Sequence, residues 1–276
     1  MKSKDVLIVS LSDMHSGSSR ALFPNRTMQF VESQTNHTPT PSQQEIYNHW
    51  KACLETVKAK RKGKTLYIVH NGDATENQHH NSIQVIGGIK EHAEIHLELM
   101  QEMLKAVGFS KKEGDRLYYV EGTESHTLTV ENFIGKELGA EISSTIGDKD
   151  YYAFPELRLD VNGKWIWYTH HGGSAGDGAS EGDAYRNWLK RIYFNNLKGN
   201  KKQPDMVISA HVHKPIYTNY TQDWHIIHGM ILPSWQLKTR YAYRAAPFQR
   251  NDIGLAITEV TAEGDIRIEK PLVLEI

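Results

Sequence analysis

The sequence has a single cysteine, Cys53, among 276 residues, and this excludes an internal disulfide. It lacks long apolar runs: none approaches the about 18 residues of a membrane span, and the run at residues 6–9 is too short for a signal peptide. Excess charge is missing as well, because 32 Lys and Arg stand against 33 Asp and Glu. A balanced chain gives no global reason for tight binding to nucleic acid or to a membrane surface. These absences predict a cytoplasmic protein that does not bind membranes.

A chain of 276 residues can bury a sizeable core, and we expect a single domain over residues 1–276. Two parts of that domain differ in composition from the rest: a long polar excursion at about residues 16–41, and a β-rich C-terminal part at about residues 205–276. Loops as long as this excursion are usually functional or mobile. The sequence carries no signal for an oligomeric state.

Short apolar runs alternate with segments of helical periodicity. The runs predict buried strands at residues 5–11, 64–70, 116–120, 164–168 and 206–208. The helical segments lie at residues 42–57, 88–107, 130–138 and 184–197. The first of them begins with Ser42-Gln43-Gln44-Glu45, a capping-box pattern that predicts a helix start at Ser42. Alternating strands and helices predict an α/β fold.

Histidine is abundant, with 15 copies, and it is the commonest metal ligand. Each predicted strand is followed by histidine or carboxylate side chains, both of which bind metals: Asp13 and His15, Asp73, Glu124 and His126, His170 and His171, and His211 and His213. Singly, each is better explained as a turn or surface residue. Together they favour a metal site, because ligands bind at the carboxyl ends of strands in open α/β sheets.

The ligand types indicate which metal is expected. Mixed Asp and His ligands without Cys favour Mn, Fe, Zn or Co over Ca or a structural zinc site. Six good ligands are too many for one tetrahedral ion. They suit two divalent metal ions about 3.5–4 Å apart that share a carboxylate.

These motifs resemble those of the calcineurin-like metallophosphoesterases. Asp13-x-His15, Gly72-Asp73, the segment from Gly122 to His126, His171-Gly172 and His211-x-His213 occur in that family's order, from residue 5 to about 215. The resemblance implies an α/β fold of two packed mixed β-sheets flanked by helices. It also implies the metal ligands: Asp13, His15 and His213 for one ion, His171 and His211 for the other, and Asp73 as the bridge.

The third motif departs from the family pattern. The family usually has Gly-Asn-His there, with Asn as a ligand and His as the proton donor, whereas this chain has Gly122-Thr123-Glu124-Ser125-His126. Thr123 or Glu124 takes the place of the Asn, or His126 binds the metal. As the proton donor, His126 is the expected catalytic residue. The segment is similar to a variant among phage-encoded members, so the resemblance extends to a phage protein in the host cytoplasm.

Seven further residues are candidates for supporting roles at the site. Glu76 is expected as a hydrogen-bond partner of a ligand. His170 is the alternative to His171, which is preferred because it directly precedes a glycine. Substrate contacts are suggested at two histidines in the loop after the second motif and at three arginines in a tyrosine-interleaved stretch near the C-terminus: His79, His80, Arg240, Arg244 and Arg250. Singly, each arginine is better explained as part of a solvated surface loop.

The function implied is that of a dinuclear-metal-dependent phosphoester hydrolase, most simply a phosphodiesterase that acts on a small phosphoester or nucleotide. Hydroxide that bridges the two metals is the expected nucleophile. One alternative is a nuclease of the same family acting on DNA or RNA, with a local basic groove from Lys198, Lys201 and Lys202. An alternative of another class is a metal-binding module without catalysis, favoured by the altered third motif.

Overall fold

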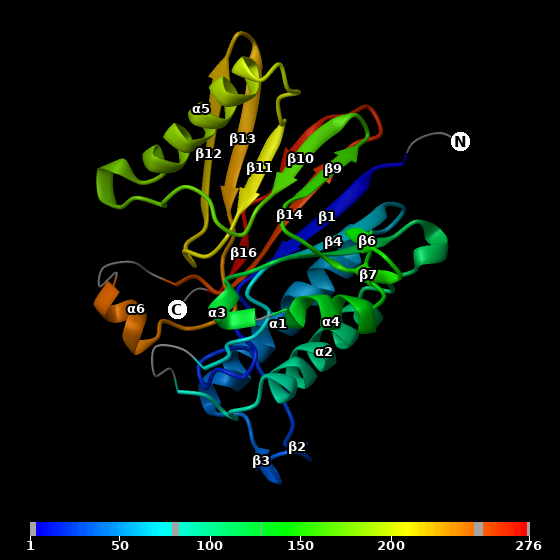
Figure 1. Ribbon diagram of the computed structural model, residues 1–276, viewed down its shortest axis with the longest axis vertical. Coiled ribbons are helices and arrows are strands. Elements are labelled where there is room, and N and C mark those ends of the chain that lie inside the picture. The colour runs from blue at the N-terminus through cyan, green and yellow to red at the C-terminus, as the bar shows by residue number, and fades with distance from the viewer. Residues whose placement is uncertain (1–3, 79–82, 128, 246–250, 275–276) are drawn as a thin grey trace.

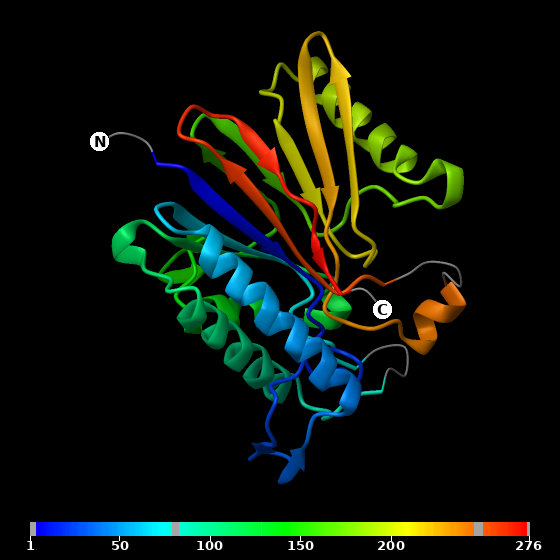
Figure 2. The ribbon, with the colours of Figure 1, turned by 180° about the vertical axis from the view of Figure 1, so that it is seen from behind.

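The computed structural model describes residues 4–78, 83–127, 129–245 and 251–274. The suggested substrate contacts His79, His80 and Arg250 lie outside this part of the chain. Two sheets pack face to face, with helices on their outer faces (Figures 1 and 2). The predicted α/β class with two packed mixed sheets is confirmed.

The first sheet has the strand order β15-β14-β1-β4-β5-β8, with β16 paired to β14. β1, β4, β5 and β8 run parallel, while β14 is antiparallel to β1. Its strands are β1 (Val6–Leu11), β4 (Thr65–Asn71), β5 (Arg116–Val120), β8 (Ala153–Phe154), β14 (Gly254–Val260), β15 (Ile266–Ile268) and β16 (Leu272–Val273).

The second sheet has the order β12-β13-β11-β10-β9. β10, β11 and β13 run parallel, and the strands at both edges are antiparallel to their neighbours. Its strands are β9 (Leu157–Val161), β10 (Lys164–Tyr168), β11 (Met206–Ser209), β12 (Ile216–Gln222) and β13 (His225–Ile231). Two small hairpins lie apart from both sheets: β2 (Met28–Phe30) with β3 (Thr35–His37), and β6 (Ser144–Ile146) with β7 (Lys149–Tyr151).

The helices cover the sheets on their outer sides (Figure 1). α1 (Pro41–Lys60), α2 (Ile89–Ala106) and α4 (Val130–Glu137) lie against the first sheet, and α5 (Asp183–Lys198) lies against the second. The shorter helices are α3 (Glu124–Thr127), α6 (Arg240–Ala245), η1 (Lys111–Glu113) and η2 (Gly178–Ser180). No helix within the described ranges combines the length and apolar character needed to span a membrane.

α1 begins at Pro41, one residue before the predicted start at Ser42. Thr40 is the N-cap: its hydroxyl accepts from Gln43 N, and the Gln43 side chain accepts from Thr40 N. Pro41 occupies the first turn, where its fixed φ and missing N–H suit a helix start. The capping box is therefore Thr-x-x-Gln, not Ser-x-x-Glu.

The core is divided by the first sheet. Val6 and Ile8 of β1 face the second sheet, whereas Leu7, Val9 and Leu11 face α1 and α2. All six residues of β1 are buried, as expected of a strand covered on both faces. This rigid central strand fixes where the segment after Leu11 leaves the sheet.

Candidate metal centre

The carboxyl ends of β1, β4, β10 and β11 meet at one end of the packed sheets. Asp13 N donates to Gly72 O at 3.0 Å, and His15 N donates to Asp73 O at 3.0 Å. Ala210 N donates to His170 O at 3.0 Å, which ties the segments after β10 and β11 together. Asn71 Nδ2 then links the two sheets through the Thr169 carbonyl oxygen. These hydrogen bonds, three between backbone groups and one from the Asn71 side chain, hold the four segments together.

Five of the six predicted ligands have left-handed backbone conformations. Their φ angles are 50° for Asp13, 44° for His15, 53° for Asp73, 73° for His211 and 57° for His213. Such angles are uncommon for residues other than glycine, and strained backbone concentrates at functional sites. The backbone therefore turns at each of these residues, two to four positions after the strand that precedes it has ended.

Asp13, His15 and His213 form the first of two ligand groups. His213 Nε2 lies 3.1 Å from Asp13 Oδ1 and 3.1 Å from His15 Nε2. Asp13 is fully buried, and its Oδ1 accepts no hydrogen bond of good geometry within the described structure. Its Oδ2 accepts from Ser12 Oγ and from His211 N. Two imidazole nitrogens and an unsatisfied carboxylate oxygen converging in this way suit a cation.

Asp73 lies between this group and the second one. Its Oδ2 is 3.9 Å from His15 Nε2 and 3.2 Å from His170 Nε2, while its Oδ1 accepts from Thr123 N at 2.6 Å. One carboxylate oxygen therefore faces ligands from both groups. This is the position that a bridging carboxylate requires.

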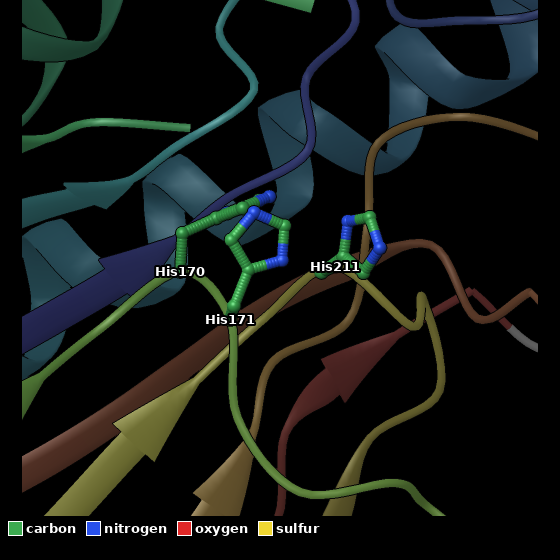
Figure 3. Close-up of side chains that lie close together, drawn as sticks. All are labelled: His170, His171 and His211. Carbon is green, nitrogen blue, oxygen red and sulfur yellow. The ribbon is translucent and has the colours of Figure 1, made fainter. Parts of the chain in front are cut away.

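The second group consists of His170, His171 and His211, whose ligand nitrogens lie within 4.8 Å of one another (Figure 3). His170 is buried and faces Asp73, whereas His171 and His211 are exposed. His170 Nδ1 bonds to Asn71 O at 2.7 Å, and this leaves Nε2 of the neutral ring as a lone-pair donor. The preferred ligand His171 lies beside His211, with ring centroids 4.5 Å apart, but the contact with Asp73 belongs to its neighbour His170.

The third motif contributes Thr123 and His126 to the centre. Thr123 Oγ1 lies 3.4 Å from Asp73 Oδ2, from His170 Nε2 and from His211 Nδ1. The side chain of Glu124 is exposed. His126 Nδ1 bonds to Glu76 O at 3.0 Å, and its Nε2 points toward Asp73 Oδ2 at 3.9 Å.

Two buried carboxylates, Glu76 and Glu131, hold a candidate ligand and the backbone next to the centre in place. Glu76 contacts His15 Nδ1 at 2.8 Å and accepts from Gln236 Nε2 at 2.8 Å. Glu131, which the sequence did not single out, accepts from Gly122 N at 2.7 Å and from Ala74 N at 3.2 Å. It therefore joins the Asp73 segment to the Thr123 segment. Burial and the charge of Asp73 raise the pKa of Glu131 to about 8.

The buried charges set the protonation of the imidazoles. Burial would lower the pKa of His15, but the hydrogen bond and charge of Glu76 raise it to about 9. Burial likewise opposes protonation of His170, yet the Asp73 carboxylate raises its pKa to about 10. By contrast, burial and the charge of His170 lower the pKa of His211 to about 4. Metal ions require deprotonated ligands, so metal binding here would displace protons from His15 and His170.

No protein-family model and no curated protein matches this sequence. Solved structures of similar fold include wild-type Vps29 complexed with Zn²⁺ from Entamoeba histolytica, at 12% identity and a TM-score of 0.39, with 96% of this chain and 99% of that chain covered. The sulfate thiohydrolase SoxB from Thermus thermophilus matches at 10% identity and 0.44, covering 98% and 57%. The NAD nucleotidase NadN from Haemophilus influenzae matches at 13% and 0.41, covering 97% and 55%. The interpretation of the site rests on the positions of this chain's own side chains.

Proposed function

We propose that this protein is a dinuclear-metal-dependent phosphoester hydrolase and that phosphodiesters are its substrates. The observation that carries the proposal is the position of Asp73 Oδ2 between two groups of ligands. Asp13, His15 and His213 would hold one ion, and His170 and His211 the other, with Asp73 shared. The donor set suits Mn, Fe, Zn or Co, and the unsatisfied Asp13 Oδ1 is the kind of atom that a cation satisfies.

Two bound ions would supply Lewis acidity and an activated water near neutral pH. The chain itself would supply the proton for the leaving group. Glu76 O holds the His126 ring through Nδ1, so that Nε2 faces the candidate centre. A histidine oriented in this way can donate a proton to the departing oxygen.

The proposal is tested by elemental analysis of the purified protein together with turnover of a bis-aryl phosphate in the presence of Mn²⁺. We expect about two metal equivalents and measurable hydrolysis. Monoester and triester analogues in the same assay test the preference for diesters. A folded, metal-loaded sample without turnover across Mn, Fe, Zn and Co would instead identify a metal-binding module that lacks catalysis.

Thr123 gives a prediction about the missing family Asn. Its hydroxyl is equidistant from Asp73, His170 and His211, so we propose that it binds or orients the second ion. Replacing Thr123 with Val keeps the shape but removes the hydroxyl, and we expect this to weaken binding of the second ion by about 10- to 100-fold. Titration calorimetry with Mn²⁺ measures the effect.

The matched control is Thr123→Ser, which keeps the hydroxyl. The backbone bond from residue 123 to Asp73 Oδ1 survives in both variants, since its donor is the main-chain N–H. If both variants bind the second ion like the original chain, the hydroxyl has no role at the metal.

A further inference from the structure

The outer face of β10 carries a row of side chains that leads to the candidate metal centre. Pairing with the segment of β11 continues past the end of β10, because Thr169 N donates to Ile208 O and Ala210 N donates to His170 O. The alternation of faces therefore continues too: Ile166, Tyr168 and His170 are buried on the inner side. The opposite side presents the more accessible residues, in order Trp165, Trp167, Thr169 and His171.

A pocket of about 280 Å³ lies over the start of this row. α5 packs against β12 and β13 at one side of the second sheet. β9 and β10 lie at the other side of that sheet, away from α5 (Figure 1). Trp165 and Trp167 line the pocket together with Asn196 near the end of α5. The remaining polar lining residues are the cations Arg158, Lys201 and Lys202.

The cations are held against the indole rings. Arg158 Cζ lies 4.6 Å from the ring centroid of Trp167, and Lys202 Nζ lies 4.3 Å from that of Trp165. Register explains the first contact, because Arg158 of β9 is directly opposite Trp167 of β10. Surfaces that bind single-stranded nucleic acids combine aromatic rings with cations. Here a cation already covers one face of each ring, so a base would stack on the Arg158 guanidinium or displace the Lys202 ammonium, and phosphates would contact the cations.

Two nearby carboxylates pair with two of the three lining cations. Asp160 accepts from Trp165 Nε1 at 3.1 Å and lies 3.7 Å from Lys202 Nζ, and Glu156 pairs with Arg158. Lys201 is the third cation of the lining, so the three cations exceed these two carboxylates by one positive charge. A small positive excess of this kind suits an anionic partner.

We infer that this face, formed by Trp165, Trp167, Arg158, Lys201 and Lys202, binds single-stranded nucleic acid and directs it to the metal centre. The inference names the substrate class of the proposed hydrolase and rests on that proposal for the chemistry, though not for the binding. The distance from the tryptophans to the metal centre favours a nucleic-acid strand over a mononucleotide as the ligand. Trp165 and Trp167 are roughly 6.6 Å apart along β10, and His171 lies roughly 13 Å beyond Trp167 at about 3.3 Å per residue.

Binding is tested with a fluorescein-labelled oligothymidylate of about 12 nucleotides, by anisotropy in EDTA, where no hydrolysis occurs. We expect Trp165→Leu to raise Kd about 5-fold or more, and Trp165→Phe, which keeps an aromatic face, to stay close to the original chain. Lys201→Gln with Lys202→Gln should lower the slope of log K against log salt by about 1.4, because each lysine that neutralises a phosphate adds about 0.7 to that slope.

The matched control is Lys136→Gln with Lys149→Gln, which removes two exposed lysines of α4 and β7 that lie outside the pocket lining. It should leave both Kd and salt slope unchanged. No oligonucleotide binding, an equal effect in the control pair, or equal competition by a mononucleotide or by duplex DNA would each overturn the inference.

These experiments can refute the nucleic-acid face and the proposed hydrolase independently of each other. Turnover of the bis-aryl phosphate by the original chain reports on the metal centre, whereas oligonucleotide anisotropy in EDTA reports on the face formed by the pocket residues. An active enzyme that ignores oligonucleotides would refute the nucleic-acid face and leave the hydrolase intact. Metal-free oligonucleotide binding without any turnover would refute the hydrolase and leave the face intact.

Discussion

Replacing Asp73 with Asn is expected to reduce the bound metal from about two equivalents to one or none and to lower phosphodiester turnover by at least about 1000-fold. The side chain is 1% exposed, so Asn fits the same space. What disappears is the negative charge at Oδ2, which faces His15 on one side and His170 on the other. An amide cannot neutralise two divalent ions that lie close together. Elemental analysis after desalting and initial rates measure the two effects.

A thermal unfolding assay gives a readout that does not depend on turnover. Metal that binds the native state raises the midpoint of unfolding, so Mn²⁺ should stabilise the original chain and fail to stabilise Asp73→Asn. The matched control is Asp265→Asn, the same chemical change at an exposed residue that precedes β15. Full metal content and full turnover in Asp73→Asn would remove the bridging role from this carboxylate.

Much of the fold could be predicted because the strands carry their own signal. β1 is apolar throughout, since both its faces are covered, and β4 and β5 are parallel to it. Parallel strands end at the same edge, so side chains that follow them are brought together without any further information. This is why Asp13, Asp73 and His126, which follow β1, β4 and β5, could be grouped before their positions were known. His213 follows β11 of the second sheet and was joined to them through the resemblance to a known family.

Two different signals favour His170 and His171 as the ligand. His171 was preferred because it precedes a glycine, whereas the structure directs His170 toward Asp73. The reason is visible in the alternation of Ile166, Tyr168 and His170, which all point to the inner side of the sheet. A strand that continues its pairing past its last formal residue carries its alternation with it. Periodicity therefore favours His170 and the neighbouring glycine favours His171, so the two signals lead to different proposals for the ligand.

Other features could not be read from the sequence. Glu131 lies on α4 and bonds the backbone of Ala74 and Gly122, two segments that only the finished fold places together. Gln236 supports Glu76 across 160 residues of chain. The left-handed φ angles of the candidate ligands have no sequence signature either, because they are imposed by hydrogen bonds between loops.

The pair His170→Gln and His171→Gln separates the two candidate ligands with the same chemical change at adjacent positions. We expect His170→Gln to lose one metal equivalent and at least about 100-fold in turnover, because its Nε2 is the nitrogen beside Asp73. His171→Gln should keep both equivalents and lose less than about 10-fold, since its ring is exposed and contacts His211 at the rim of the centre. Elemental analysis, Mn²⁺ titration and initial rates measure the difference.

The two variants also test why His170 binds at all. Its Nδ1 is held by Asn71 O, so the ring can present only Nε2 to a metal, and exogenous imidazole should restore little activity unless that orientation is reproduced. Folding is checked by far-UV circular dichroism, because His170 is buried and its replacement affects the link between the sheets. If His171→Gln is the variant that loses the metal while His170→Gln keeps it, the second ion lies on the exposed side, between His171 and His211. The centre would then be more open to solvent than the position of Asp73 implies.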